Sequence, residues 1–358
     1  MQLGFIGLKF SGKSTLFELL TQGKFESVQT GMAEYHRGQV MVPDERIERL
    51  SELFNPKKTT FAQFDCIDVM GLPASMRTDQ AAKYLEAVRQ TDALVAVIQA
   101  FEGYNAEGQL AKIDPIADLK RLEDDLIFAD LLVVESRLDK VKHLKQRGAP
   151  QFDQHELDIL EKCHKTLEDD TSLRKIEISE NEAKLIRGFQ LLSLKPLMAV
   201  INCDETYYSK KDELEAAFSA TFKDIQVTSV SALAEKEIQE LDADERDMFM
   251  EELGIETPAI NHVISTSYAA IGLISFFTVG EDEVRAWNLR TPATAPEAAG
   301  VIHSDLQKGF IRAEVIAYND FMDVNGNMAD AKSKGTVRLE GKEYPVKDGD
   351  ILNIRFNV

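Results

Sequence analysis

The chain has 358 residues, of which 44% are hydrophobic and 28% are charged, as in ordinary globular domains. Its length predicts two or three domains, and no run of about 18 uncharged apolar residues could cross a bilayer. The formal net charge of -20 argues against a general nucleic-acid or membrane-surface binder, and in particular against DNA. A locally basic face can still act, because salt screens charges beyond about 10 Å.

The N-terminal residues carry no basic region followed by an apolar stretch and a cleavage site, so we expect a cytoplasmic protein. The three cysteines, Cys66, Cys163 and Cys203, are too few and too scattered for a disulfide framework or a zinc site. This usage agrees with a reducing compartment.

The first predicted unit is a strand, a glycine-rich turn and a helix, over residues 2–6, 7–12 and 14–21. Residues 7–14 read G-L-K-F-S-G-K-S, which matches G-x-x-x-x-G-K-[ST] in its required context. We predict a loop whose backbone amides surround a nucleoside triphosphate, with Lys13 near the β- and γ-phosphates and Ser14 on Mg²⁺. The expected nucleotide contacts here are Phe10, Ser11, Gly12, Lys13, Ser14 and Thr15.

Further β-like runs at residues 60–69, 93–99 and 197–201 alternate with helical patterns such as residues 79–89. This alternation predicts a parallel sheet with ligands at the carboxyl ends of its strands. The first of these runs ends in D-x-x-G, so Asp68 is expected to hold Mg²⁺ and Gly71 to contact the γ-phosphate. The predicted catalytic set is therefore Lys13, Asp68 and Gly71, and the predicted metal ligands are Ser14 and Asp68.

Base recognition is expected where the strand at residues 197–201 ends. GTPases commonly carry N-K-x-D at this place, whereas this chain has Asn202, Cys203, Asp204 and Glu205. The carboxylate of Glu205 is one methylene longer than that of Asp, which weakens the case for guanine selectivity. The alternative for Asn202 is a turn-forming role. The predicted base-side contacts are Asn202, Cys203, Glu205, Ser231, Ala232 and Leu233.

Two other sequence patterns follow, one helical and one β-like. Residues 118–184 have helical spacing with a break at residues 147–150, which favours an inserted antiparallel helical hairpin, although two ordinary surface helices fit the same pattern. Beyond residue 277 the pattern changes to short β-like pieces and sharp turns. These pieces predict a small β-rich domain with strands at residues 276–279, 310–315, 336–339, 343–346 and 351–356.

These elements, in this order, resemble the YchF subfamily of Obg-related P-loop NTPases, also known as Obg-like ATPases. Further landmarks are V-P-D-E-R at residues 42–46, R-Q-T-D-A at 89–93, and the segments 280–287, 294–305, 308–315 and 355–358. The resemblance implies an α/β P-loop NTPase domain (residues 1–117 and 185–276), a helical hairpin (118–184) and a TGS domain of ubiquitin-like β-grasp fold (277–358). It also implies ATP rather than GTP.

The departures from the family lie around the γ-phosphate. Phe10 stands where relatives carry Asn, and Met32 stands where they present a Mg²⁺-binding Thr unless Thr30 replaces it. No glycine follows Gly71 before the next helix, so the hinge there is expected to be stiffer. These changes predict retained binding with slow hydrolysis.

The sequence therefore predicts a slow ATPase, with GTP as the other candidate nucleotide, that switches a ribosomal or other translation partner. The resemblance implies contacts with ribosomal RNA or protein through the TGS domain, which carries His303, Lys308, Arg312, Arg338 and Lys342, and through the hairpin. The alternative is an adaptor that binds nucleotide without useful hydrolysis. A small-molecule kinase is disfavoured, because no acceptor-binding segment is evident.

Overall fold

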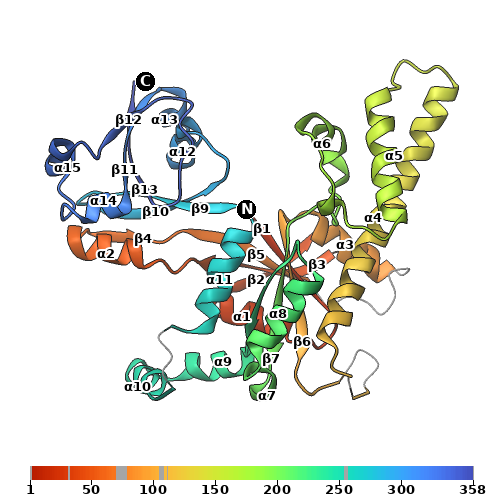
Figure 1. Ribbon diagram of the computed structural model, residues 1–358, viewed down its shortest axis with the longest axis horizontal. Coiled ribbons are helices and arrows are strands. Elements are labelled where there is room, and N and C mark those ends of the chain that lie inside the picture. Colours follow the sequence, from red (N-terminus) through yellow and green to blue (C-terminus); the bar gives the residue numbers. More distant parts are fainter. Residues whose placement is uncertain are drawn as a thin grey trace. The chain divides into compact units, whose positions relative to one another are not determined.

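The computed structural model describes residues 2–30, 33–69, 79–104, 109–110, 112–253 and 257–357. The chain divides into two compact units (Figure 1). The first unit contains Met1–Gln39 and Asp65–Val263, and the second contains Val40–Phe64 and Ile264–Val358. Among the described residues, no helix combines the length and the apolar character that crossing a membrane requires.

The first unit is built on a seven-stranded sheet in the order β2-β3-β5-β1-β6-β7-β8. Strands β5, β1, β6, β7 and β8 are parallel, and β2 and β3 form an antiparallel pair at one edge. Every residue of β6 and β7 is buried, as expected for central strands covered on both faces. The strand bounds are β1 Gln2–Gly7, β2 Phe25–Thr30, β3 Ala33–Met41, β5 Gln63–Val69, β6 Ala93–Ala100, β7 Leu197–Cys203 and β8 Gln226–Val230.

Helices connect these strands, and apolar side chains of α3, α4 and α8 pack into the core of the sheet. The parallel strands end at one edge, so the segments after β1, β5, β6, β7 and β8 gather there. The helix bounds are α1 Lys13–Leu20, α3 Asp79–Arg89, α4 Pro115–Gln146, α5 Gln154–Glu168, α6 Glu180–Ile186, α7 Glu205–Tyr208, α8 Lys211–Thr221, α9 Ala232–Glu240 and α10 Ala243–Leu253. Helix α11, Ala259–Ala270, begins in the first unit and continues into the second.

The predicted helical insertion is confirmed by α4 and α5, which lie side by side in Figure 1. The Asp114 side chain caps α4 by accepting a hydrogen bond from the Ala117 amide at 3.2 Å, and Pro115 occupies the first helical position. The two helices share their own buried apolar core, which includes Leu138 of α4 and Leu160 of α5. The predicted break at residues 147–150 coincides with the connection between them.

The second unit contains a six-stranded mixed sheet in the order β12-β11-β13-β9-β10-β4. Its strands are β4 Lys58–Thr60, β9 Leu273–Thr278, β10 Glu283–Arg290, β11 Phe310–Ala317, β12 Arg338–Glu340 and β13 Asp350–Phe356. Its helices are α2 Glu45–Phe54, α12 Ala295–Ile302, α13 Ser304–Lys308, α14 Tyr318–Met322 and α15 Met328–Lys334. The sheet domain predicted at the C-terminus is thus confirmed.

One predicted strand of this unit is wrong. Residues 343–346 form no strand, and Pro345 makes only an isolated bridge with Thr294. Proline has no backbone N–H to donate to a sheet, which limits pairing at this position. The sequence pattern also missed β10, whose residues 285–290 pair with β9.

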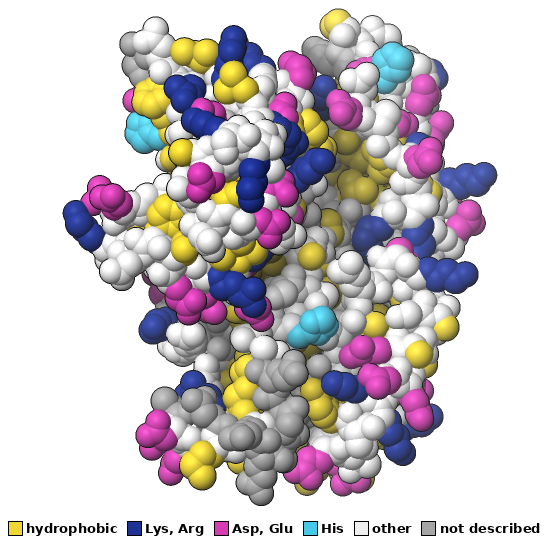
Figure 2. Space-filling model, turned by 60° about the vertical axis from the view of Figure 1, so that its left-hand side comes forward, with side chains coloured by type: hydrophobic (Ala, Val, Ile, Leu, Met, Phe, Trp, Pro, Cys, Tyr) yellow, Lys and Arg dark blue, Asp and Glu magenta, His cyan; other side chains and the backbone are white. Residues whose placement is uncertain are grey.

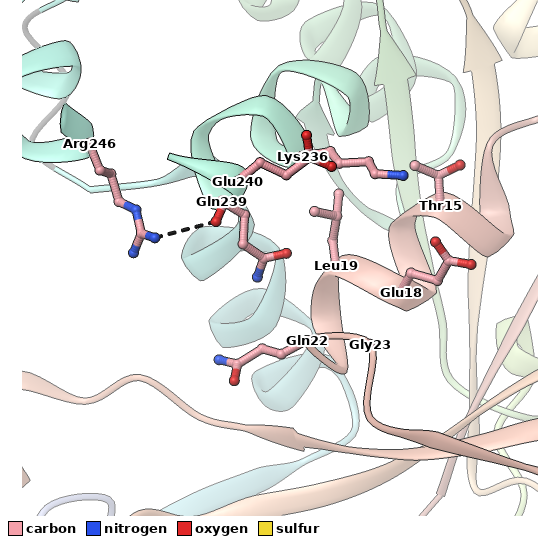
Figure 3. Close-up of a pocket in the computed structure, with 9 residues that line it drawn as sticks. All are labelled: Thr15, Glu18, Leu19, Gln22, Gly23, Lys236, Gln239, Glu240 and Arg246. Carbon is pink, nitrogen blue, oxygen red and sulfur yellow. Dashed lines mark hydrogen bonds between the residues drawn. The ribbon is translucent and has the colours of Figure 1, made fainter. Parts of the chain in front are cut away.

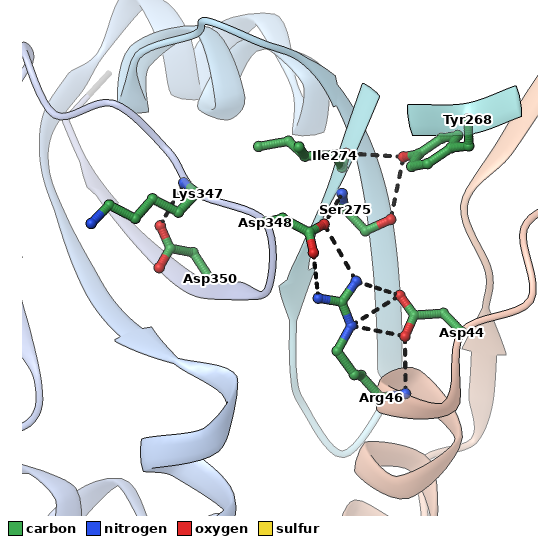
Figure 4. Close-up of polar contacts among 8 residues, drawn as sticks. All are labelled: Asp44, Arg46, Tyr268, Ile274, Ser275, Lys347, Asp348 and Asp350. Atoms are coloured by element: carbon green, nitrogen blue, oxygen red, sulfur yellow. Dashed lines mark hydrogen bonds and ion pairs between the residues drawn. The ribbon is translucent and has the colours of Figure 1, made fainter. Parts of the chain in front are cut away.

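The segment Val40–Phe64 belongs to the second unit, which differs from the domain boundaries that the sequence suggested. Strand β4 pairs with β10, and Arg46 links α2 to the turn before β13 (Figure 4). The Arg46 guanidinium lies 2.8 Å from Asp44 and 2.7 Å from Asp348. Asp348 in turn accepts a hydrogen bond of 2.9 Å from the Ser275 amide. Long-range pairing of this kind leaves no local signal in the sequence.

Candidate nucleotide site

The phosphate-binding loop connects β1 to α1 and has a backbone suited to anions. Phe10 and Gly12 adopt left-handed conformations, with φ of 71° and 82°. The Ser11 amide donates to the Leu8 carbonyl at 3.2 Å, and the Leu16 amide starts α1 by donating to Gly12 at 3.0 Å. Left-handed residues alternating with right-handed ones turn successive N–H groups toward one concavity, which is the geometry that binds phosphate.

Gly12 is required at its position for two reasons. Its φ of 82° is unfavourable for residues with a side chain, and a Cβ atom here would lie 2.1 Å from Nδ2 of Asn202. The loop is therefore packed against the end of β7.

Lys13, Ser14 and Asp68 form a compact polar cluster at the carboxyl edge of the sheet. The Lys13 ammonium forms an ion pair with Oδ1 of Asp68 and donates to the Val69 carbonyl at 2.5 Å. The Ser14 hydroxyl donates to Oδ2 of Asp68 at 2.7 Å. The side chains of Lys13 and Asp68 are only 5% and 4% exposed, so their charges interact with little screening by solvent. The structure thus brings together three of the residues that the sequence singled out.

Burial lowers the pKa of Lys13 to about 7, although a carboxylate lies beside it. Removing an ammonium group from water disfavours its charged form. A bound phosphate would favour the charged form again, so phosphate binding and protonation of Lys13 are linked at this site.

The residues present fit Mg²⁺. Ser14 and Asp68 offer hydroxyl and carboxylate oxygens, which are the ligands that this ion prefers. Magnesium in such sites usually keeps phosphate oxygens and water in its shell besides one or two protein ligands. A bound Mg²⁺ would neutralise charge on the phosphates. The buried Ser11 hydroxyl has no hydrogen-bond partner within the described part of the chain and offers a further polar group.

Asn202 connects the phosphate loop with the segment after β8. Its Nδ2 donates to the Ser11 carbonyl at 3.1 Å, and its Oδ1 accepts from the Ala232 amide at 3.0 Å. Both ends of the amide therefore hold backbone groups of the site in place. The sequence suggested a base contact or a turn, and this bridging role was missed because its partners lie far away along the chain.

The other predicted base-side residues differ in exposure. Cys203 is buried, and burial raises the pKa of its thiol to about 12, so its side chain belongs to the core. Glu205 is exposed in the first turn of α7, and Leu233, 68% exposed, lies in the first turn of α9. Ser231 caps α9 by accepting from the Ala234 amide at 3.4 Å.

The sequence analysis did not predict the structural role of Asp204, which lies between Cys203 and Glu205. Its side chain accepts from the Tyr207 amide at 3.0 Å and from the Glu102 amide at 3.4 Å, so it joins α7 to the segment after β6. An Asp directly before a helical pattern is a capping signal that could have revealed the first contact. The predicted residues Met32 and Gly71 lie outside the described residues.

Comparison with known proteins finds relatives that match almost the whole chain. The ribosome-binding ATPase YchF of Bacillus subtilis (strain 168) is 40% identical over 364 residues, which cover 99% of each chain. The chain belongs to the YchF family. The YchF protein of Haemophilus influenzae, also a ribosome-binding ATPase by name, is 38% identical over 99% of each chain.

Two further comparisons, one with a solved structure and one with a family model, also match this YchF family member. The solved YchF GTPase of Schizosaccharomyces pombe has a TM-score of 0.82 and 28% identity, with 99% of this chain and 97% of that chain covered. The family model YchF-GTPase_C, described as a protein of unknown function (DUF933), matches residues 273–357. The P-loop NTPase fold expected from the sequence is therefore confirmed.

A separate hollow of about 530 Å³ lies beside the phosphate-loop helix of this YchF family member (Figure 3). Its walls come from α1, α9 and α10, and they mix Glu18 and Glu240 with Lys236. Arg246 also lines it, but its guanidinium donates to the Ile238, Gln239 and Leu241 carbonyls. Because that guanidinium caps the end of α9, it is not free to bind an anion in the hollow. The cluster of Lys13, Ser14 and Asp68 is therefore the candidate nucleotide site.

Proposed function

We propose that the chain binds ATP with Mg²⁺, hydrolyses it slowly and uses the occupancy of this site to control its association with the ribosome. The cluster formed by Lys13, Ser14 and Asp68 carries this proposal, because it combines a phosphate-binding cation with two oxygen ligands for Mg²⁺. The names of the bacterial relatives, ribosome-binding ATPase, support both the reaction and the partner. A cytoplasmic location follows from this partner.

Adenine is the proposed base. The carboxylate at the fourth position of the base motif is Glu205 and not Asp, so it reaches further than the carboxylate that pairs with the guanine amino edge in N-K-x-D proteins. Relatives are named both as ATPase and as GTPase, so GTP is the competing nucleotide.

Slow hydrolysis is proposed from Phe10. Its side chain is 53% exposed and its φ is 71°, a conformation that costs a non-glycine residue about 1–2 kcal/mol. A ring with this exposure gains little from packing, and a phenyl group cannot offer the amide oxygen that relatives carry here. The same observation favours the second candidate function, an adaptor that holds nucleotide without useful turnover.

The helical hairpin is one part of the chain whose position nucleotide binding is proposed to change. Strand β5, which carries Asp68, is followed in sequence by α3, and α3 ends at Arg89. Arg89 forms an ion pair of 2.9 Å with Asp130 of α4 and also donates to the Ala129 carbonyl at 3.1 Å. A displacement of α3 would therefore be transmitted through Arg89 to α4 of the hairpin.

The second unit is the other part whose position nucleotide binding is proposed to change. Its residues 277–358 are proposed to form a TGS domain of β-grasp fold. Strands β3 and β5 of the nucleotide-binding sheet are joined through Val40–Phe64, which belongs to the second unit. Within that unit, β4 of this segment pairs with β10, and Arg46 lies 2.7 Å from Asp348. Strand β5 is thus covalently continuous with a part of the C-terminal unit.

The proposal is tested by sedimenting the protein with purified bacterial ribosomes in the presence of ATP, ADP or no nucleotide, with phosphate release measured on the same samples. The proposal expects nucleotide-dependent association and measurable release, both lost in Lys13→Ala. Nucleotide-dependent association without release would establish the adaptor, and association that ignores nucleotide would refute the switch.

A further inference from the structure

The phosphate loop contains a second lysine besides Lys13. Lys9 and Lys13 are the two charged residues of the segment 7–15. The nucleotide contacts expected from the motif begin at Phe10 and so do not include Lys9. Lys9 is therefore a cation of the loop to which the nucleotide site assigns no role.

Lys9 lies at the tip of a tight turn in this loop. The Ser11 amide donates to the Leu8 carbonyl at 3.2 Å, which makes Lys9 and Phe10 the two central residues of the turn. Phe10, at the second central position, has a positive φ of 71°, as that residue has in a type II turn. Both central residues are exposed. The turn therefore presents the Lys9 side chain at the surface of the loop.

The Phe10 ring lies beside the Lys9 ammonium. The Nζ atom of Lys9 is 5.0 Å from the centre of the ring, which is within the range of a cation–π interaction. This contact restricts a flexible side chain to positions near the loop. In the part of the chain that the structure describes, Lys9 forms no ion pair with a carboxylate. Its charge is therefore available to a ligand of the loop.

A bound triphosphate brings more negative charge to the site than Lys13 can balance. Lys13 forms a buried ion pair with Asp68, so these two side chains together carry no net charge. A bound Mg²⁺ neutralises part of the charge of the phosphates. The face of the molecule in Figure 2 mixes Lys and Arg side chains with Asp and Glu side chains, and the whole chain has a net charge of -20. Because the overall field of such a chain does not attract anions, a cation within the loop itself stabilises the bound triphosphate.

We propose that Lys9 contacts the γ-phosphate of bound ATP and makes the site prefer ATP to ADP, an inference that rests on the proposed function. Strand β1, which leads into the loop, lies between β5 and β6, and its Phe5 is paired with Asp68 of β5. A Mg²⁺ ion held by Asp68 would bridge the β- and γ-phosphates. At the other end of the loop, Gly12 packs against Asn202, on the side of the predicted base contacts. Lys9 belongs to the half of the loop that starts beside β5, so it lies nearer to the terminal phosphate than to the base.

The alternative for Lys9 is a solvated lysine that only rests on a neighbouring ring. In that case its removal would change the affinities for ATP and ADP little and to the same extent. The proposed contact predicts a loss confined largely to ATP, because ADP has no γ-phosphate. The ratio of the two affinities therefore separates the two explanations.

The test is calorimetric titration of the full chain with Mg²⁺ and either ADP or a non-hydrolysable ATP analogue. The variant is Lys9→Gln, and the control is Lys223→Gln, which removes the same charge from an exposed lysine just before β8, at the amino ends of the parallel strands. We expect about tenfold weaker binding of the ATP analogue by Lys9→Gln, a change of less than about threefold for ADP, and little change in the control. Lys9→Arg keeps the charge and should retain most of the preference for the ATP analogue. Added KCl should reduce the difference between Lys9→Gln and the unmodified chain, because salt screens exposed charges.

Equal losses for ADP and the ATP analogue in Lys9→Gln, or an unchanged affinity for the analogue, would overturn the inference. An equal loss in Lys223→Gln, or a loss of the preference in Lys9→Arg, would overturn it as well. If the unmodified chain binds the analogue and Lys13→Ala does not, while Lys9→Gln binds like the unmodified chain, only this inference fails. Absent binding of ATP and its analogue by the unmodified chain would instead refute the proposed function.

Discussion

The Lys13 ammonium and the Asp68 carboxylate form a buried ion pair between the phosphate loop and the end of β5. This pair predicts a pH dependence, because the pKa of Lys13 is lowered to about 7. Below that pH Lys13 is already charged. As the pH rises through it, the free protein loses a proton that a bound phosphate must restore, so ATP affinity should fall, by at most about tenfold per pH unit.

Calorimetric titration in buffers of different ionisation enthalpy measures this proton uptake directly. The control is Lys13→Arg, since a guanidinium keeps its charge and leaves only the titration of the nucleotide's own phosphates. Identical proton uptake in the two proteins above pH 7 would contradict the assignment of the titrating group to Lys13.

Asn202→Ala should weaken binding of ATP and GTP alike and destabilise the fold by about 1–3 kcal/mol. The substitution leaves the Ser11 carbonyl and the Ala232 amide without their partner, and such buried groups are costly to leave unsatisfied. Urea unfolding and nucleotide titration measure the two effects. A loss confined to one nucleotide would mean that Asn202 reads the base and does not only position the loop.

Gln99→Ala provides the matched control for this prediction. Gln99 lies next to the last residue of the neighbouring strand β6 and is also buried, but its amide donates to the nearby Phe101 carbonyl, two residues away. It should therefore affect nucleotide binding less than Asn202→Ala does.

Glu205→Asp should raise GTP affinity relative to ATP affinity by about tenfold, because the shorter carboxylate has the length found in N-K-x-D motifs, and a hydrogen bond to a charged group contributes about 1.5–3 kcal/mol. Glu237→Asp, at an exposed position of α9, is the matched control. Competition between the two labelled nucleotides gives the ratio, and an unchanged ratio would remove Glu205 from the base-binding residues.

Asp130→Ala should destabilise the protein by about 3–5 kcal/mol in urea unfolding. The buried Asp130 carboxylate accepts from Arg89 at 2.9 Å and from the Leu192 and Ser193 amides at 2.9 and 2.7 Å. Its removal leaves an uncompensated charge and two orphaned amides. Asp139→Ala, exposed on the same helix, should change stability by less than about 0.5 kcal/mol, and equal effects of the two substitutions would contradict this account.

The sequence predicted what depends on local pattern. The phosphate loop, α3 and the break between α4 and α5 follow from spacing and glycine positions, and the structure places them where expected. Lys13, Ser14 and Asp68 could be grouped in advance because parallel strands end at one edge of a sheet.

The sequence did not reveal contacts between distant segments. The bridging role of Asn202 depends on Ser11, 191 residues away. The pairing of β4 with β10 joins residues near 58 to residues near 283, and three residues of β4 carry too little alternation to predict a strand. Burial, which decides the pKa of Lys13, likewise follows from packing and not from the motif.

The most direct test of the central claim is calorimetric titration of the purified full chain with ATP and Mg²⁺, repeated with Lys13→Ala. The proposed site predicts saturable binding by the unmodified chain and no detectable binding by the variant, because the buried cation that meets the phosphates is gone. Equal affinity in the two proteins would contradict the assignment of nucleotide binding to the cluster of Lys13, Ser14 and Asp68.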